Sequence, residues 1–351
     1  MSRWAPWLLF AAALVMAYLT RGILLPFIIG LAVAYLLDPA ADRLEALGVP
    51  RGAAAGLIIA SFFLVSGGLL VLIWPLLQDQ IVGLAAALPA ALQELRPQVV
   101  GFLESLSERL GTDFELNAEG LTTQVTQEGL NRLMAVVSGA LSSGLAFFSL
   151  VSLLLISPVV AFYLLRDYDR IVARLDEMLP ARHRPILEDQ WRQIDEALSG
   201  FVRGQILIGL IMAAIYAVGW SLVGLNFALV LGLLAGVLSF IPFLGMIAAA
   251  GLALIVAFQQ FGTDWLSIGL VAGVYLFVQV LEGSVLTPRI MGDRIGLHPV
   301  WVLFAVFAGG ELAGFVGVLL AVPVAAVVGV LVRFTVERYI KPAARPQDLS
   351  S

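Results

Sequence analysis

Eight apolar runs, almost free of charged residues, recur along this chain of 351 residues. A helix needs about 20 apolar residues to cross a hydrocarbon core of roughly 30 Å, and most of the runs are that long. Only 13% of the residues are charged, whereas soluble proteins carry roughly 25%. The sequence therefore predicts an all-α polytopic membrane protein with about eight membrane segments. The runs are 4–20, 22–37, 52–77, 142–165, 203–223, 225–261, 265–286 and 297–332.

The charged residues between the runs indicate which side of the membrane each loop faces. The segment 166–203 holds seven arginines, whereas the longer segment 78–138 holds three beside eight acidic residues. Basic residues accumulate in cytoplasmic loops, so the first segment is predicted to be cytoplasmic and the second external. The same count places both termini in the cytoplasm.

The predicted topology divides the chain into six parts. Leu84, Leu88 and Leu92 belong to a series of apolar residues spaced by three and four, which is typical of amphipathic helices. This series predicts an external helical arm, and the charged segment after residue 165 predicts amphipathic helices along the membrane surface. The parts are 1–77 with the N-terminal spans, 78–138 as the external arm, 139–165 with one span, 166–202 with the cytoplasmic helices, 203–335 as a C-terminal membrane domain with broken helices, and 336–351 as a cytoplasmic tail.

Two of the runs, 225–261 and 297–332, are long enough to fold back on themselves. A single crossing of each would place Arg289 and Arg294 outside, whereas a hairpin in each returns both arginines to the cytoplasm. Proline removes a helical N–H and glycine permits a turn. The two runs also resemble each other at an offset of 72 residues, which fits either an inverted repeat of broken helices or chance similarity between two apolar helices. The predicted helix breaks are Pro242, Gly245, Gly309, Gly310 and Gly314.

Ionisable residues at membrane depth are costly and are functional candidates by default. Glu282 lies near the end of an apolar run, where it either binds a proton or cation or pairs with Arg289 or Arg294. Glu311 lies in the second predicted break, where it either lines a cavity or faces amides freed at a helix N-terminus. Neutral polar residues in the runs can hydrogen-bond a solute or a neighbouring helix. The predicted substrate or ion pathway comprises Glu282, Glu311, Gln205, Asn226, Gln279 and Arg289.

Several other functions are disfavoured by what the chain contains. A net charge of −5 and a pI near 5.1 argue against nucleic-acid binding. The chain has no cysteine, and its two histidines, His183 and His298, are too far apart in sequence for a local metal motif. No glycine-rich phosphate loop ending in lysine is present. The sequence therefore predicts no enzyme, no bound metal and no cofactor, so uphill transport would need an ion gradient.

A series of short motifs, in one order along the chain, resembles the autoinducer-2 exporter family. The resemblance covers essentially the whole chain and is strongest over 155–335. The motifs are Ser157 to Asp167 (SPVVAFYLLRD), Arg203-Gly204-Gln205, Leu225 to Gly245 with its Ile241-Pro242 step, Thr287 to Gly292 (TPRIMG), Gly296-Leu297-His298-Pro299, and Gly317 to Pro323 (GVLLAVP).

The resemblance implies a multi-pass protein of the bacterial inner membrane that forms homo-oligomers, described as pentamers. It implies a transporter that exports a small polar metabolite, with the quorum-sensing signal autoinducer-2 as the family's named solute. A sodium/proton antiporter is the alternative within transport. The alternative from another class is an oligomeric membrane scaffold without transport activity, assembled through the arm at 78–138. The expected partners are other copies of the chain, the lipid bilayer and a small solute or ion.

Overall fold

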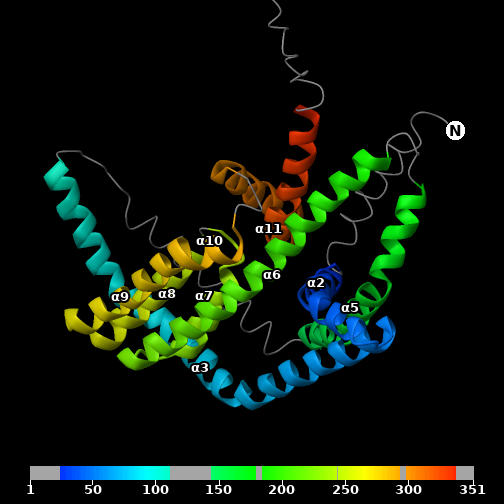
Figure 1. Ribbon diagram of the computed structural model, residues 1–351. Coiled ribbons are helices and arrows are strands. Elements are labelled where there is room, and N and C mark those ends of the chain that lie inside the picture. The colour runs from blue at the N-terminus through cyan, green and yellow to red at the C-terminus, as the bar shows by residue number, and fades with distance from the viewer. Residues whose placement is uncertain (1–23, 111–143, 179–183, 243, 293–297, 337–351) are drawn as a thin grey trace, which may run out of the picture. The chain divides into compact units, whose positions relative to one another are not determined.

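The computed structural model describes residues 24–110, 144–178, 184–242, 244–292 and 298–336 (Figure 1). Within these ranges the regular structure is helical, without a strand, which confirms the predicted all-α class. The run 4–20 and the end of the arm lie outside the described residues. The helices are α2 (Leu25–Ala46), α3 (Arg51–Leu110), α5 (Gly144–Met178), α6 (Arg184–Val223), α7 (Ala228–Leu238), α8 (Leu244–Phe261), α9 (Trp265–Leu281), the π-helix η2 (Glu282–Leu286), α10 (Thr287–Ile290) and α11 (Pro299–Thr335).

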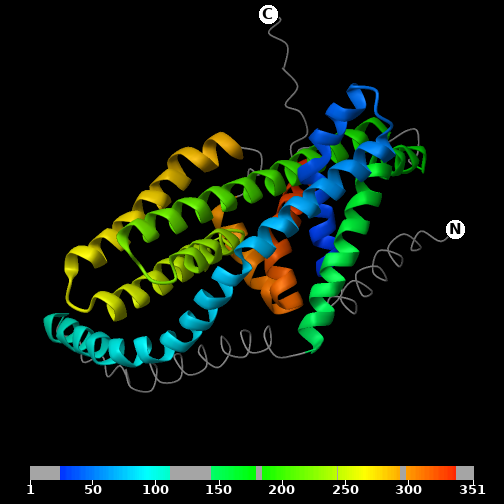
Figure 2. The same cartoon turned by 90° about the horizontal axis from the view of Figure 1, so that it is seen from below.

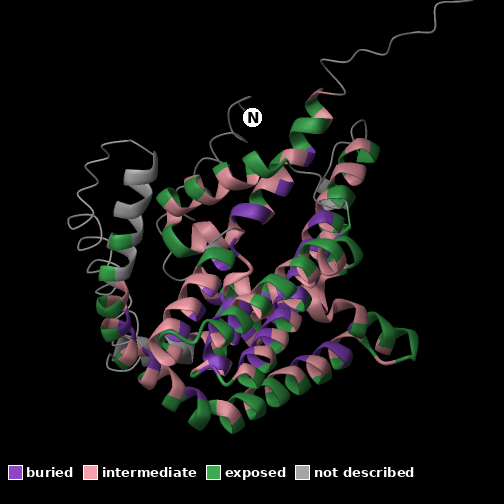
Figure 3. Ribbon diagram, turned by 90° about the vertical axis from the view of Figure 1, so that its left-hand side faces the viewer, coloured by how far each residue is buried: buried purple, intermediate pink, exposed green. Residues whose placement is uncertain are grey.

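Five helical segments of the described part are long and apolar enough to cross a membrane: Leu25–Ala46, Arg51–Leu95, Arg184–Val223, Trp265–Ile290 and Pro299–Thr335. Their exposed faces (green in Figure 3) carry large apolar side chains, including Leu64 at 79% and Leu222 at 83% exposure. Contact with lipid hydrocarbon costs these side chains no free energy, whereas their contact with water is unfavourable. The chain is therefore a multi-pass membrane protein, and the total of eight membrane segments stays a prediction.

Three long helices continue without a break past the predicted membrane boundaries. Helix α3 passes residue 77 with Pro75, Pro89 and Pro97 inside it, α5 passes residue 165, and α6 passes residue 203. A change from apolar to charged residues alters what surrounds a helix, but it supplies neither a cap nor a turn that would end it. The described parts of the predicted arm and of the predicted cytoplasmic segment are thus continuous with the helices of the apolar runs.

The chain divides into two compact units, and three long helices contribute residues to both. The first unit comprises Met1–Ser61, Ile156–Ile206 and Thr287–Ser351. The second unit comprises Phe62–Leu155 and Leu207–Leu286. Each is described below on its own.

In the second unit the run 225–261 folds back on itself. The backbone N–H of Asn226 donates to Oε1 of Gln260 over 2.7 Å, and Nε2 of Gln260 donates to the carbonyl of Gly224 over 2.7 Å. These bonds join the two ends of the run, while the chain reverses between α7 and α8 near Pro242. Figures 1 and 2 show α7, α8 and α9 lying side by side.

Small residues let α6 and α7 pack backbone to backbone in the second unit. A Cβ on Gly232 would lie 2.8 Å from Cα of Ala217, and a Cβ on Gly236 would meet the carbonyl of Gly209. The hydrophobic effect does not drive helices together inside lipid, so van der Waals contacts at such close approaches supply much of the attraction between the helices. The contacts hold the α7–α8 hairpin against α6.

In the first unit α11 bends sharply at Gly314, whose φ of 60° and ψ of −139° are not helical. A Cβ on Gly309 would meet the carbonyl of Gly317, and a Cβ on Gly317 would meet the carbonyl of Gly309. Eight residues span about 12 Å along a straight helix, so the run 297–332 also folds back. The orange and red parts of α11 accordingly point in different directions in Figure 1. The inverted repeat stays a prediction.

Candidate functional site

A stripe of three polar residues runs along one face of the apolar helix α9 and into η2. Tyr275, Gln279 and Glu282 follow one another at spacings of four and three, which places them on one helix face over two turns. Between Arg203 and Arg289 the sequence contains neither lysine nor arginine, and its acids are Asp264 and Glu282. The stripe therefore lies in a part of the chain that offers no basic side chain of its own.

Helix α6 adds Tyr216 to the stripe, so that a stack of rings supports it. Nε2 of Gln279 donates to the hydroxyl of Tyr216 over 3.1 Å. The Tyr216 ring stacks on Tyr275 with centroids 6.3 Å apart and on Trp220 with centroids 4.6 Å apart. Tyr216 and Trp220 are completely buried, and the indole N–H of Trp220 donates to the carbonyl of Val271 over 3.2 Å. These contacts hold the Tyr275 ring in place from behind.

Tyr275 also connects the stripe to the α7–α8 turn. The hydroxyl of Tyr275 donates to the carbonyl of Met246 over 3.3 Å, in the first turn of α8. Pro242 lies in the turn itself, whereas Gly245 is already helical. A Cβ on Gly245 would meet the backbone of Leu238, so glycine permits the close approach of α7 and α8. The structure thus brings the break at Pro242 beside the polar stripe.

Glu282 begins the π-helix η2 and is partly buried. Within the described part of the second unit no cation or hydrogen-bond donor contacts its carboxyl group. Arg289, one of its two predicted partners, belongs to the first unit, and Arg294 lies outside the described residues, so the predicted pairing stays a prediction. A π-helical turn inside an α-helix is frequent at functional sites. Burying a carboxylate without a partner costs free energy, unless a ligand or a water molecule hydrogen-bonds to it.

A cavity of about 250 Å³, here called the α8–α9 cavity, adjoins the stripe. Among the described residues that line it, Tyr275 alone is polar, and it belongs to both the cavity and the stripe. The other lining residues are small or aliphatic: Ala250, Ala253, Leu254, Val271, Ala272 and Leu276.

The remaining predicted pathway residues are not part of this cluster in the second unit. Asn226 is exposed beside Gln260, and α9 separates that end from Glu282 by about 25 Å at 1.5 Å per residue. Gln205, Arg289 and Glu311 belong to the first unit. Gln205 is buried in α6, whereas Arg289 and Glu311 are exposed, the latter three residues before the bend at Gly314. Gly309 and Gly310 are helical and pack against the second half of α11.

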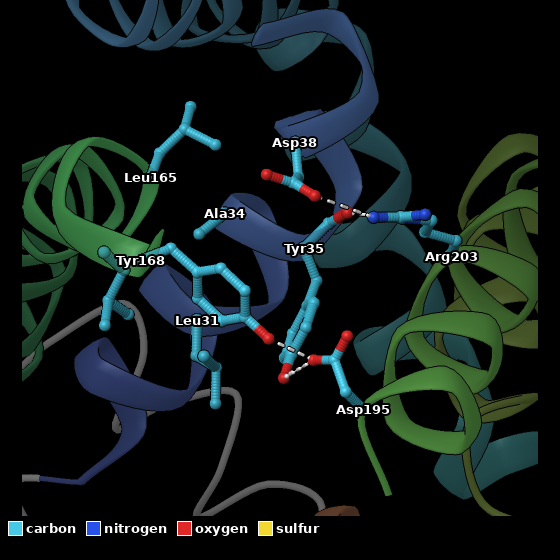
Figure 4. Close-up of a pocket in the computed structure, with 9 residues that line it drawn as sticks. Leu31, Ala34, Tyr35, Asp38, Leu165, Tyr168, Asp195 and Arg203 are labelled. Carbon is cyan, nitrogen blue, oxygen red and sulfur yellow. Dashed lines mark hydrogen bonds and ion pairs between the residues drawn. The ribbon is translucent and has the colours of Figure 1, made fainter. Parts of the chain in front are cut away.

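The first unit contains a charged network that the sequence did not reveal (Figure 4). Asp38 of α2 pairs with Arg51 of α3 over 2.7 Å and with Arg203 of α6 over 3.3 Å. Nε of Arg203 also donates to the carbonyl of Tyr35 over 2.6 Å, and Nε of Arg51 donates to the carbonyl of Leu165 over 3.2 Å. Two arginines therefore tie α2, α3, α5 and α6 together around one carboxylate.

A second carboxylate of the first unit, Asp195, is bonded to hydroxyl groups instead. The hydroxyls of Tyr35 and Tyr168 both donate to its Oδ1 atom, the former over 3.0 Å. Burial, and then the hydrogen bond to Asp195, raise the pKa of Tyr168 above its ordinary value of 10.0, so this hydroxyl stays protonated and donating. Tyr35, Tyr168 and Asp195 help to line a half-open cavity of about 30 Å³, enough for one water molecule.

The sequence offered a signal for only part of these two sites. Tyr275 could have been found by counting back two turns from Glu282, because the helical period places both on one face. No local pattern pairs Asp38 with Arg203 or Tyr35 with Asp195, since about 160 residues separate the members of each pair. Among the described residues no three acidic or histidine side chains converge as metal ligands.

Comparison with known proteins identifies the family. The family described as AI-2E family transporter matches residues 7–337. The "Putative transport protein YrrI" of Bacillus subtilis is 28% identical over 312 residues, which cover 89% of this chain and 86% of that protein. The "Putative permease PerM" of Escherichia coli is 26% identical over 313 residues, which cover 88% and 86%. With almost its whole length matched, the chain belongs to the AI-2E transporter family.

Proposed function

We propose that this membrane transport protein is a secondary permease of the bacterial inner membrane that exports a small polar solute past Glu282. Both termini then lie in the cytoplasm, as the distribution of arginines predicts. The observation that carries the proposal is the partly buried Glu282 carboxyl, which has no partner within the described part of the second unit and lies on a polar stripe beside a broken helix. Membership of a transporter family supports transport rather than catalysis.

The arrangement has the properties that a solute site within a membrane needs. Irregular backbone at membrane depth is tolerated where protein or a water-filled cavity satisfies its polar groups, and Tyr275 bonds the first turn after the break at Pro242. Acidic residues at that depth mark substrate or ion pathways because their charge is costly elsewhere. The chain has no phosphate-binding loop, so an ion gradient is the energy source proposed for uphill export.

The proposal is tested by comparing extracellular metabolites from a deletion strain complemented with wild type, Glu282→Gln or Glu311→Gln. Glu282→Gln should lower the export of the affected solute by roughly tenfold or more, the equivalent of one charged hydrogen bond. Autoinducer-2 is the first solute to measure, because the family bears its name. Asp264→Asn is the matched control, since it removes the other acid between Arg203 and Arg289 and should leave export unchanged. If correctly inserted Glu282→Gln exports every solute as wild type does, the assignment is wrong.

Sodium/proton antiport is the second candidate, and the same carboxylate favours it, because a carboxylate without a cation partner can exchange a proton for a metal ion. Purified protein in liposomes should then show proton flux driven by a sodium gradient, and Glu282→Gln should abolish it. A metabolite exporter need show no such flux. Assembly as a homo-oligomer, with five subunits by resemblance, also stays a prediction, and mass measurement in detergent tests it.

A further inference from the structure

We propose that Glu282, Tyr275 and the α8–α9 cavity together bind a small organic cation that carries a hydrocarbon part. This inference rests on the proposed function and narrows its solute to one chemical class: an amine that is protonated at neutral pH and bears a short aliphatic or single-ring body.

The charge of the ligand follows from what surrounds Glu282. Within the described part of the second unit its carboxyl has no cation or donor partner, and the sequence from 204 to 288 contains no lysine or arginine. The ring of Tyr275, two helical turns earlier on the same face, offers an aromatic surface for the body of the ligand. Tyr216, inclined by 15° to that ring, stacks on it and holds it in position. A neutral or anionic solute would leave the carboxylate without a counter-charge.

Most of the hydrogen-bonding capacity that remains free on the stripe is that of acceptors. The hydroxyl hydrogen of Tyr275 goes to the carbonyl of Met246, and one of the two N–H groups of the Gln279 amide donates to Tyr216. Lone pairs of the Tyr275 hydroxyl, the Gln279 carbonyl oxygen and both Glu282 oxygens are left. An ammonium group has donors only, so it complements this set, whereas a carboxylate or phosphate does not.

The size of the ligand follows from the cavity. The α8–α9 cavity holds about 250 Å³ and is apolar apart from Tyr275, so it would remain unused by a bare metal ion. Tyr275 and Glu282 are seven residues apart, a rise of about 10 Å in a helix. A Cβ on Gly283 would meet nothing within 4 Å, so the flank of Glu282 is open. An amine can therefore place its ammonium group at Glu282 and its body against Tyr275 and the cavity.

The test measures equilibrium binding of three probes to the purified full-length protein in lipid nanodiscs at pH 7. The probes are phenethylammonium, its neutral analogue phenylethanol and its anionic analogue phenylacetate. Phenethylammonium should bind most tightly, and Glu282→Gln should weaken it by roughly tenfold or more while Asp264→Asn leaves it unchanged. Tyr275→Phe should keep most of the affinity, and Tyr275→Leu should lose about threefold or more, because only phenylalanine keeps an aromatic ring against the body of the ligand.

The hydrocarbon part is tested with Ala250→Leu, which fills part of the cavity. This variant should weaken phenethylammonium by roughly tenfold but leave methylammonium, which does not reach the cavity, unaffected. Equal affinity for the cation and its neutral analogue, or unchanged binding in Glu282→Gln, would overturn the proposal. Unchanged binding of phenethylammonium in Ala250→Leu would overturn the role of the cavity and indicate that a lipid chain occupies it. If Glu282→Gln abolishes export and the wild type shows no preference for the cation, this inference fails while the proposed function stands.

Discussion

Asp38 of the first unit and Glu282 of the second are both partly buried carboxylates on apolar helices, yet their surroundings are opposite. Asp38 lies between Arg51 and Arg203, at 2.7 and 3.3 Å. Glu282 has no cation partner within the described part of the second unit and lies two helical turns from Tyr275 on the polar stripe. A carboxylate whose charge is already compensated holds helices together, whereas one without compensation is available to a ligand. The difference predicts a structural role for Asp38 and, under the proposed function, a ligand-binding role for Glu282.

The strongest test of this comparison is to remove charge from each site and measure stability in detergent. Arg51→Ala should destabilise the protein by about 3 kcal/mol, because it leaves Asp38 with a single arginine in a partly buried site. Glu282→Gln should change the free energy of unfolding by less than about 0.5 kcal/mol, since it breaks no bond to a described residue. Arg170→Ala is the control, because Arg170 is 80% exposed in a surface pair. Equal losses for Arg51→Ala and Glu282→Gln would refute the distinction.

The backbone conformations at the turns of the two hairpins also differ between the units. The first unit turns at Gly314, with a positive φ that side chains rarely adopt, whereas the second turns at Pro242 with a gap between α7 and α8. Gly314→Ala should therefore cost about 1–3 kcal/mol of stability, as measured by thermal unfolding. Gly251→Ala, at a helical position with nothing within 4 Å of its Cβ, should be neutral or slightly stabilising. A neutral Gly314→Ala would show that α11 does not need its bend.

The tyrosines at the two sites offer a finer test. Tyr168→Phe removes a hydroxyl that donates to Asp195 and should cost about 1–2 kcal/mol in stability, with little effect on solute affinity. Tyr275→Leu should show the reverse pattern, with a larger effect on solute binding than on unfolding. The two measurements are the free energy of unfolding in denaturant and the affinity for the probe. If Tyr275→Leu changes stability as much as it changes probe binding, the tyrosine rings of the second unit are structural too.

The smallest expected effect concerns Asp264, the acid that begins α9. Its side chain accepts hydrogen bonds from Ser267 and from the backbone N–H of Leu266, and the Ser267 hydroxyl in particular lowers its pKa below the ordinary value of 3.8. A lowered folded pKa means that the contribution to stability is complete above pH 3.8 and is lost as the pH falls toward the folded value. Unfolding followed from pH 6 to pH 3 should show this loss in the wild type and not in Asp264→Asn. Identical profiles would contradict the capping role.

Much of the fold could be predicted because it depends on local composition. The length of each apolar run sets the number of helical turns it can form in lipid, and the arginine count required reversals in 225–261 and 297–332. Pro242 and Gly314 mark the two turns, since neither residue continues a helix in the conformation found there. The ends of α3, α5 and α6 were less predictable, because a change in polarity does not end a helix.

The sequence by itself determined that this chain is helical, spans a membrane and carries an acidic residue, Glu282, near the end of an apolar run. Only the tertiary structure decided that Asp38 has two arginines, that Asp195 has two tyrosines, and that Tyr216 supports Gln279. The physical reason is distance along the chain. Hydropathy and periodicity are properties of neighbouring residues, whereas charge compensation depends on which side chains meet after helices far apart in sequence have packed.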